Sequence, residues 1–194
     1  MELYSKANIP TAHGHFDFSV YKKEDGEEIT VLSLGDFSKL DKSQEVFVRI
    51  HSECVTSEIF GSLKCDCKNQ LDLALKEIQK RELGVLVYLK QEGRGIGLGN
   101  KIKAYDLQAK GLDTVEANHK LGFETDLRSY DDAIIILKKL GIEHISINTN
   151  NPLKIEALES STFKSVSRNA SVTISNVHNQ PYIDTKKSKC GHLF

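Results

Sequence analysis

The chain has 194 residues, enough for one substantial domain or for two small lobes that share a core, and its 39% hydrophobic and 27% charged content is ordinary for a globular protein. Its 26 basic and 27 acidic residues nearly cancel, which argues against a nucleic-acid-binding protein with a broad basic face. No apolar run approaches the roughly eighteen residues of a membrane span, so no membrane partner is expected. The first ten residues contain no apolar signal segment, which together with close-set cysteines favours a cytoplasmic protein.

The chain is expected to begin with a β-rich part over about residues 1–40. Residues 46–51 then alternate between apolar and polar or bulky side chains, which predicts a half-buried strand with Arg49, His51 and Glu53 on one face. A short apolar run over residues 85–89 predicts a strand that is buried on both faces.

Apolar residues at helical spacing predict further elements, each closed by a polar or glycine-containing turn. The predicted helices are Asn69 to Arg81, Leu98 to about Gly111, and Asp131 to Leu140, and residues 144–148 and 163–176 are predicted strands. Strands that alternate with helices indicate an α/β (mixed α+β) fold, with mixed sheets and flanking helices in one domain over residues 1–194. The tail over about residues 181–194 is polar, and we expect it to be mobile without a ligand.

Three of the four cysteines, Cys54, Cys65 and Cys67, lie within fourteen residues. Structural zinc sites usually close with four Cys or His ligands, whereas catalytic sites use three and leave one position for water. Three thiolates favour zinc over magnesium or calcium. The alternatives are reduced core or loop cysteines, or a structural zinc completed by His51 or another histidine. The H-S-E string at residues 51–53 matches half of the zinc nucleobase deaminase signature, but the P-C-x-x-C half is missing, so that family is excluded.

A glycine-rich segment, QEGRGIGLG over residues 91–99, follows a predicted strand and opens a predicted helix. Such a junction presents backbone N–H groups and the positive end of the helix dipole to a phosphate. The glycine spacing matches neither a P-loop nor G-x-G-x-x-G, and a flexible surface loop is the alternative. Glu92 and Arg94 within the segment favour a functional loop.

A second candidate anion site is the segment T-N-N-P-L-K at residues 149–154. Asn151 suits the N-cap of a helix, and the proline after it suits the first helical position. Lys154 in the first turn opposes the helix dipole, which a bound anion would explain, and the alternative is a harmless surface charge. Asp126 and Arg128 form a D-x-R pair that, seen alone, is more often a surface salt bridge than a catalytic pair.

Together these segments resemble the GTP cyclohydrolase II family over nearly the whole chain. The matching strings, in order, are VRIHSECVTSEIFGSLKCDC, QEGRGIGLGNKIKAY, DTVEANHKLGF, D-L-R and TNNPLKIE. The resemblance implies a GTP cyclohydrolase II-like fold and a monofunctional homodimer that hydrolyses GTP in the first step of riboflavin biosynthesis. The implied products are 2,5-diamino-6-hydroxy-4-(5-phosphoribosylamino)pyrimidine, formate and pyrophosphate. One zinc ion per subunit and magnesium bound with the triphosphate are also implied.

The resemblance also implies the site residues, position by position. The implied zinc ligands are Cys54, Cys65 and Cys67, and the implied catalytic residues are Tyr105, Asp126 and Arg128. The implied GTP-contacting residues are Arg49, Ile50, His51, Ser52, Glu53, Gln70, Glu92, Gly93, Arg94, Thr114, Thr149 and Lys154. The chain departs from the family at Gly99, where a bulkier apolar residue is expected. It also departs at residues 168–170, where R-N-A replaces R-V-P, so no role of Arg168 carries over.

Zinc lowers the pKa of bound water, so we expect hydrolytic attack at C8 of guanine followed by release of C8 as formate. Glu53 and Tyr105 are candidates for orienting the base and water, and Glu116 for accepting hydrogen bonds from guanine. Arg128 is either the nucleophile at the α-phosphate, with Asp126 accepting its proton, or a clamp on that phosphate while water attacks. A non-catalytic, zinc-stabilised nucleotide sensor and a GTP pyrophosphohydrolase that yields GMP are the alternative functions.

Overall fold

A computed structural model describes residues 1–193, and the chain divides into two compact units. Unit 1 comprises residues 1–51, 71–89 and 130–171, and unit 2 comprises residues 52–70, 90–129 and those from 172 onward. Each unit is therefore assembled from separate stretches of chain. The single domain expected over residues 1–194 stays a prediction. Among the helices within residues 1–193, none has the length and apolar character needed to cross a membrane.

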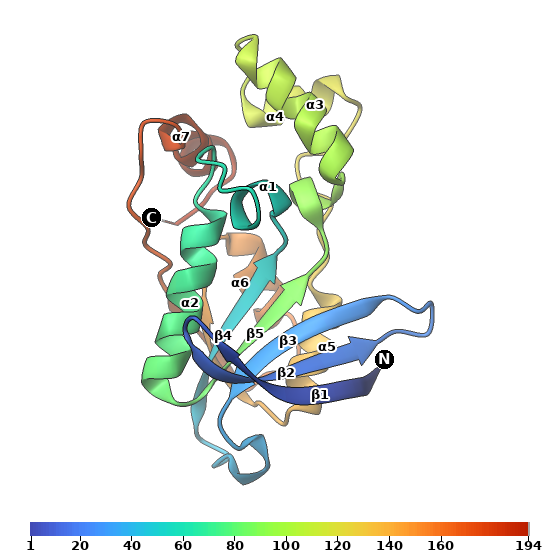
Figure 1. Cartoon of the computed structure of the whole chain (residues 1–194), viewed down its shortest axis with the longest axis vertical. Coiled ribbons are helices and arrows are strands. Elements are labelled where there is room, and N and C mark those ends of the chain that lie inside the picture. The colour runs from blue at the N-terminus through green and yellow to red at the C-terminus, as the bar shows by residue number, and fades with distance from the viewer. Residues whose placement is uncertain (194) are drawn as a thin grey trace. The chain divides into compact units, whose positions relative to one another are not determined.

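Unit 1 is built on a seven-stranded mixed sheet with the strand order β1-β2-β3-β5-β4-β6-β7 (Figure 1). The strands β1 to β3 and β5 are antiparallel neighbours, whereas β4, β6 and β7 run parallel. This arrangement confirms the mixed α/β class and the strands predicted over residues 85–89 and 144–148. The strands are β1 (Glu2–Thr11), β2 (Gly14–Lys22), β3 (Glu28–Leu34), β4 (Glu45–Ser52), β5 (Gly84–Leu89), β6 (His144–Asn148) and β7 (Ser165–Asn169).

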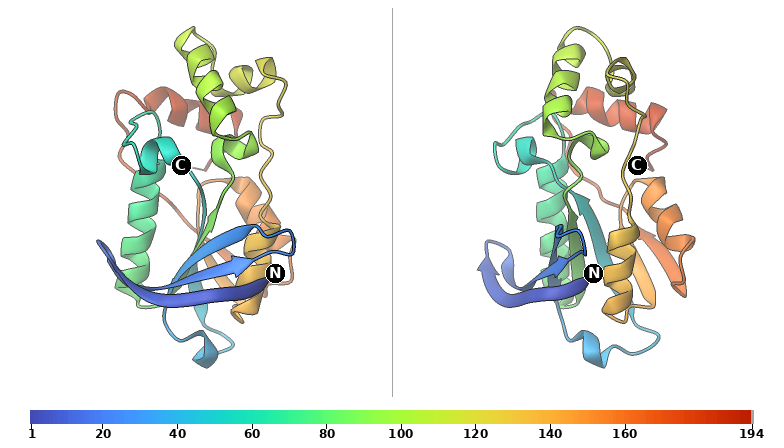
Figure 2. Two further views of the ribbon diagram at one scale, coloured as in Figure 1. Left: turned by 45° about the vertical axis from the view of Figure 1, so that its right-hand side comes forward. Right: turned by 90° about the vertical axis from the view of Figure 1, so that its right-hand side faces the viewer.

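Helices cover both faces of this sheet, with α2 on one face and α5 on the other (Figure 2). Successive side chains of a strand point to opposite faces, so the apolar residues 46, 48 and 50 of β4 pack into the core beneath α5. Phe47 points the other way and packs with Ala74 and Ile78 of α2. The helices of this unit are α2 (Cys67–Arg81, whose first turn belongs to unit 2), α5 (Asp131–Lys139), α6 (Pro152–Glu159) and the 3-10 turn η1 (Phe37–Lys39).

The strand β4 ends at Ser52, which corrects one expectation about its polar face. Arg49 and His51 lie two residues apart on the strand, and an Arg49 guanidinium nitrogen lies 3.4 Å from Nδ1 of His51, so the two share a face as predicted. Glu53 lies beyond the end of the strand and does not belong to that face. The chain leaves the sheet at this point to form α1, so strand alternation no longer sets the direction of the Glu53 side chain.

The expectation of edge strands over residues 163–176 is only partly correct. The strand β7 pairs with β6 and ends at Asn169, and residues 170–176 form no strand. The amide side chain of Asn150 takes the place of a neighbouring strand at Ser171. Its Nδ2 donates to the Ser171 carbonyl at 2.6 Å, and its Oδ1 accepts from the Ser171 N–H at 3.0 Å. A side chain can thus form the backbone hydrogen bonds that an extended segment would otherwise make with a neighbouring strand.

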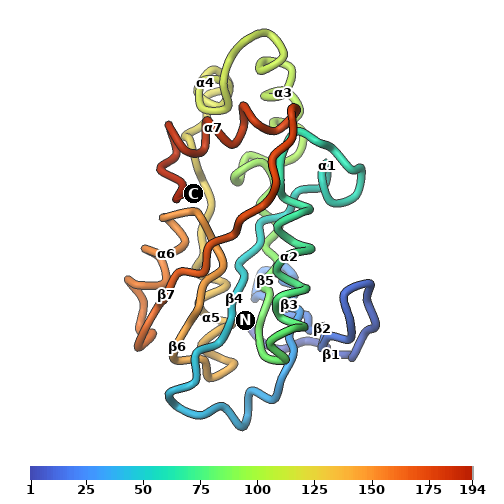
Figure 3. The backbone as a smooth tube through the Cα atoms, turned by 90° about the vertical axis from the view of Figure 1, so that its left-hand side faces the viewer, coloured from blue at the N-terminus to red at the C-terminus, as the bar shows by residue number. Residues whose placement is uncertain are grey.

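Unit 2 consists of short helices and loops, and α4 contacts both α3 and α7 (Figure 3). Helix α4 begins with a capping box, in which Asp113 and Glu116 satisfy the first backbone N–H groups of the turn. A helix, α7, lies within the tail expected over residues 181–194, and mobility of that tail without a ligand stays a prediction. The elements are α1 (Val55–Glu58), η2 (Glu92–Gly95), α3 (Leu98–Ala109), α4 (Thr114–Lys120) and α7 (Gln180–Lys189).

Candidate functional site

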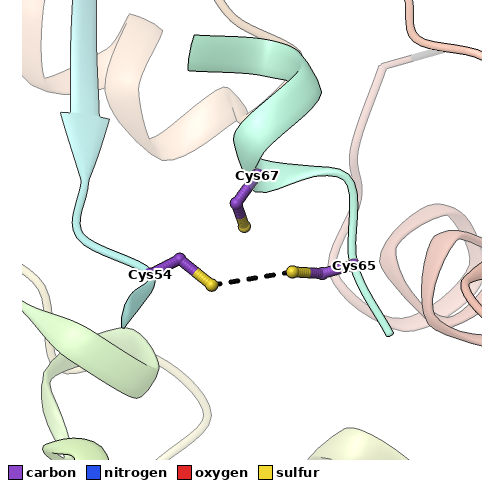
Figure 4. Close-up of side chains that lie close together, drawn as sticks. All are labelled: Cys54, Cys65 and Cys67. Carbon is purple, nitrogen blue, oxygen red and sulfur yellow. Dashed lines mark hydrogen bonds between the residues drawn. The ribbon is translucent and has the colours of Figure 1, made fainter. Parts of the chain in front are cut away.

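The three clustered cysteines come from the two ends of one loop in unit 2 (Figure 4). Cys54 precedes α1, Cys65 lies at the end of the loop, and Cys67 is the first residue of α2. Their sulfur atoms all lie within 4.8 Å of one another, and Sγ of Cys54 is 3.6 Å from Sγ of Cys65. Two thiolates on a tetrahedral zinc ion, each at ~2.3 Å, are about 3.8 Å apart. The cluster therefore fits a zinc ion without a large rearrangement.

The electrostatics of this cluster also suit a divalent cation. The neighbouring thiols of Cys65 and Cys67, followed by the ammonium of Lys101, hold the pKa of Cys54 well below its usual range. The pKa of Cys67 is raised instead, because its sulfur faces the other two and is buried. Without a bound cation, the cluster thus favours ionisation of only one of its three cysteines. A divalent cation would allow all three to ionise.

Lys101 connects the cysteine cluster to the glycine-rich segment, and sequence reasoning assigned it no role. Its ammonium donates to Sγ of Cys54 at 3.0 Å and to Oε1 of Glu92 at 2.7 Å. The other carboxylate oxygen of Glu92 accepts from the N–H of Val55 at 2.7 Å, next to Cys54 in the chain. A lysine near the start of α3 opposes the helix dipole, the same signal that drew attention to Lys154.

The glycine-rich segment folds tightly because several of its residues have positive φ. Gly93 and Arg94 have φ of 64° and 62°, a conformation that is uncommon for arginine. A Cβ on Gly95 would meet the backbone of Leu127, whose carbonyl carbon lies 3.2 Å away. The N–H of Leu127 donates to the Arg94 carbonyl at 3.0 Å. Gly95 therefore allows the close approach of the loop that carries the D-x-R pair.

Asp126 and Arg128 form a two-pronged ion pair, with Nε to Oδ1 at 2.8 Å and Nη2 to Oδ2 at 2.6 Å. Burial would raise the pKa of Asp126, but the hydrogen bonds and charge of Arg128 outweigh burial and lower it. The carboxylate is thus a weak base that orients the guanidinium. The Ser52 hydroxyl accepts a long hydrogen bond from Arg128 at 3.4 Å and one from Gln91 at 3.0 Å.

In unit 1, the expected helix start at Asn151 is confirmed, because its side chain caps α6 by accepting from the N–H of Leu153 at 3.1 Å. Lys154 is 5% exposed and donates to the Ile50 carbonyl at 2.7 Å, so the alternative of a harmless surface charge is wrong. Arg49 is likewise buried and donates to the carbonyl of Asn148 at 2.9 Å. Both cations are held in place by protein oxygen atoms.

Each unit also contains an aromatic ring contact beside candidate site residues. His51 stacks on Tyr88, with ring centroids 5.8 Å apart. In unit 2, the Tyr105 ring lies 5.3 Å from Nζ of Lys64 and 5.6 Å from Nζ of Lys101. Burial raises the pKa of Tyr105, so its phenol stays protonated and can donate a hydrogen bond.

Other expected residues lie in defined local surroundings. Thr114 opens α4 directly after its N-cap, and Thr149 is buried and accepts from the N–H of Asn151 at 3.0 Å. The Glu116 side chain is exposed and accepts a hydrogen bond within the capping box, which disfavours it as a hydrogen-bond acceptor for guanine. The pKa of Glu53 is raised by burial and by nearby Glu92 and Glu58, which suits a group that transfers a proton.

The fold resembles the solved structure of RibBX, a two domain 3,4-dihydroxy-2-butanone 4-phosphate synthase from A. baumannii, with a TM-score of 0.51. That likeness covers 89% of this chain and 40% of the other at 18% identity, and it concerns the fold alone. The model of a protein family that is described as GTP cyclohydrolase II matches residues 2–169 of this chain.

Relatives support the same family over the full length. The chain is 48% identical over 193 residues to GTP cyclohydrolase-2 of Helicobacter hepaticus, covering 99% of this chain and 98% of the relative. It is 43% identical over 194 residues to GTP cyclohydrolase-2 of Picrophilus torridus, covering both chains completely. It is also 46% identical over 196 residues to Riboflavin biosynthesis protein RibBA of Aquifex aeolicus, and it spans 48% of that longer protein.

The mixed α/β fold and these relatives place the chain among the hydrolases of riboflavin biosynthesis. The chain belongs to the GTP cyclohydrolase II family.

Proposed function

We propose that this chain catalyses the zinc-dependent hydrolysis of GTP to 2,5-diamino-6-hydroxy-4-(5-phosphoribosylamino)pyrimidine, formate and pyrophosphate. The observation that carries the proposal is the convergence of three cysteine sulfurs within 4.8 Å of one another. Within residues 1–193, this is the one group of three or more Cys, His, Asp or Glu side chains that converges in this way. Three ligands leave a coordination position for water, as in catalytic zinc sites, whereas structural sites use four.

We propose that Cys54, Cys65 and Cys67 hold one zinc ion per subunit and that magnesium accompanies the triphosphate. A zinc ion held there would act as a Lewis acid that activates water for hydrolysis at C8 of guanine. We also propose that the enzyme is a cytoplasmic homodimer. The residues proposed to contact GTP are Arg49, Ile50, His51, Ser52, Glu53, Gln70, Glu92, Gly93, Arg94, Thr114, Thr149 and Lys154, and the proposed catalytic residues are Tyr105, Asp126 and Arg128.

Different residues of the chain are chemically suited to different steps of the proposed reaction. The carboxyl of Glu53, whose pKa is raised by burial and by nearby carboxylates, is suited to proton transfer, and the protonated phenol of Tyr105 can donate a hydrogen bond that orients water or base. Arg128 is oriented by its two hydrogen bonds to Asp126, and a guanidinium stays protonated in proteins, which supports binding of the α-phosphate more than nucleophilic attack. Arg94 adds a second guanidinium from the neighbouring loop, whose backbone is held by the hydrogen bond from the Leu127 N–H to the Arg94 carbonyl.

The test is an assay of the purified protein with GTP and magnesium, in which formate, pyrophosphate and the absorbance of the ring-opened pyrimidine are measured. All three signals should appear in a fixed ratio. A pyrophosphohydrolase would release pyrophosphate and GMP without formate, and a nucleotide sensor would leave GTP intact. Either of these results would contradict the proposed reaction.

An Arg94→Ala substitution tests the proposed role of the glycine-rich segment in phosphate binding. Removing a charged hydrogen-bond donor costs about 1.5–3 kcal/mol, so the KM for GTP should rise roughly tenfold to a hundredfold. Arg94→Lys keeps the charge and should recover part of the loss. The measurement is steady-state kinetics of formate release over a range of GTP concentrations. A lower kcat at an unchanged KM would show that this loop does not bind the triphosphate.

A further inference from the structure

A buried carboxylate, Asp66, lies between two of the clustered cysteines in the chain, and two of its three partners come from more than a hundred residues away in unit 2. It is 1% exposed, and its Oδ1 accepts from the ammonium of Lys186 at 3.1 Å. Its Oδ2 accepts from Gln70 at 2.5 Å and from the hydroxyl of Thr173 at 3.1 Å. Both Lys186 and Thr173 lie beyond residue 169, where the match to the family ends.

Lys186, which contacts Asp66, is itself buried, and its ammonium lies over an aromatic ring. The residue is 6% exposed, and its ammonium lies 4.4 Å from the centroid of the Tyr182 ring. One turn further along α7, Lys189 forms ion pairs with Asp113 and Glu116 in the capping box of α4. The helix α7 is thus anchored at two points, one at the cysteine loop and one at α4.

The loop between the cysteines has little apolar anchoring of its own. Phe60 is 78% exposed and Leu63 is 58% exposed, so the segment that leads to Cys65 gains little from hydrophobic burial. A buried ion pair costs desolvation energy, and removing one partner leaves an uncompensated charge. Such a pair is expected where it holds a particular conformation, and here that conformation is the one that aligns Cys65 and Cys67.

We propose that the C-terminal segment from residue 172 is part of the metal centre. Through Lys186 and Thr173 it holds Asp66, and thereby Cys65 and Cys67, in the geometry that binds the metal. Lys186, Thr173 and Asp66 are positioning residues, because they act through the cysteines. This inference rests on the proposed metal binding by the cysteine cluster, and it adds a role for a segment beyond the residues that the family model matches.

The experiment uses the full-length protein loaded with Co²⁺, which reports thiolate ligation through its charge-transfer absorbance. Loss of a residue that orients metal ligands typically lowers metal affinity about 10- to 100-fold. Lys186→Met should therefore release Co²⁺ to a chelator at least about tenfold faster and alter the absorbance spectrum. Lys186→Arg should restore much of the slow release. The matched control is Lys187→Met, the same change at the exposed neighbouring residue, which should leave release at the wild-type rate.

Thr173→Val removes one donor to Asp66 without leaving a buried charge, so it tests the inference even if Lys186→Met does not fold. It should speed Co²⁺ release by a smaller factor, with circular dichroism unchanged. A wild-type release rate in folded Lys186→Met, or in Thr173→Val if Lys186→Met does not fold, would overturn the inference and leave the proposed metal site standing. No thiolate-to-cobalt absorbance in the wild-type protein would overturn the proposed metal site together with it.

Discussion

A Cys65→Ser variant should still release pyrophosphate from GTP but should form almost no formate. The two bonds that break, at C8 of the base and at the α-phosphate, are several ångströms apart in GTP. One activated water is therefore not expected to serve both. A metal that stabilises developing charge contributes several kcal/mol, so formate release should fall roughly a hundredfold to ten-thousandfold.

The matched control for this prediction is Cys190→Ser, the same chemical change at the fourth cysteine, which lies outside the cluster. It should retain both activities. Metal analysis should show about one zinc per chain in the wild type and in this control, and a marked loss in Cys65→Ser. Circular dichroism must confirm folding, because metal loss can disorder a loop. Formate production at the wild-type rate by a metal-free, folded enzyme would refute the metal's role.

An Arg128→Ala variant should lose pyrophosphate release, in contrast to Cys65→Ser. The guanidinium is held by two hydrogen bonds to Asp126 and stays charged, so it can stabilise the charge that develops on the α-phosphate. Removal of one such donor typically lowers kcat about a hundredfold to a thousandfold. If pyrophosphate leaves before ring opening, formate release should fall by the same factor. Pyrophosphate release at the wild-type rate would rule out this role.

Arg128→Lys separates the two roles considered for this residue. A lysine keeps the positive charge but loses the planar fork, so a phosphate clamp should retain partial activity. Asp126→Asn keeps the shape of the partner and removes its charge. If Asp126 only orients the arginine, this variant should lose less activity than Arg128→Ala. If activity depends on Asp126 as strongly as on Arg128, and a covalent guanylyl (GMP) intermediate can be trapped on the enzyme, the result would instead support Arg128 as the nucleophile.

The sequence by itself determined features whose residues lie close together in the chain. The predicted strand at residues 144–148 matches β6 residue for residue, and the N-cap at Asn151 lies where its side-chain chemistry requires. The spacing of Cys54, Cys65 and Cys67 predicted a three-thiol cluster, and the structure brings their sulfurs together. Each of these signals is local, because periodicity and capping act over only a few residues.

Local patterns were insufficient for elements that are stabilised by distant partners. The helix α7 is mostly polar, and its buried side chains, Ile183 and Lys186, give no amphipathic stripe that would predict it. Its stability depends on Asp66 and on the start of α4, which lie at least seventy residues away in the chain. The α4 capping box is an exception, because its D-x-x-E signature at residues 113–116 is a local signal that the sequence itself carries.

Only the tertiary structure decided how the chemical groups are paired. Lys101 meets Cys54 across 47 positions of sequence, and Lys186 meets Asp66 across 120. Contacts of this kind depend on how whole elements pack, and no spacing rule along the chain encodes them. Long-range packing also explains why a glycine stands at position 95, because a side chain there would come too close to the backbone of Leu127. Residue types and local spacing thus specified which ligands were present, and long-range packing specified which charges orient them.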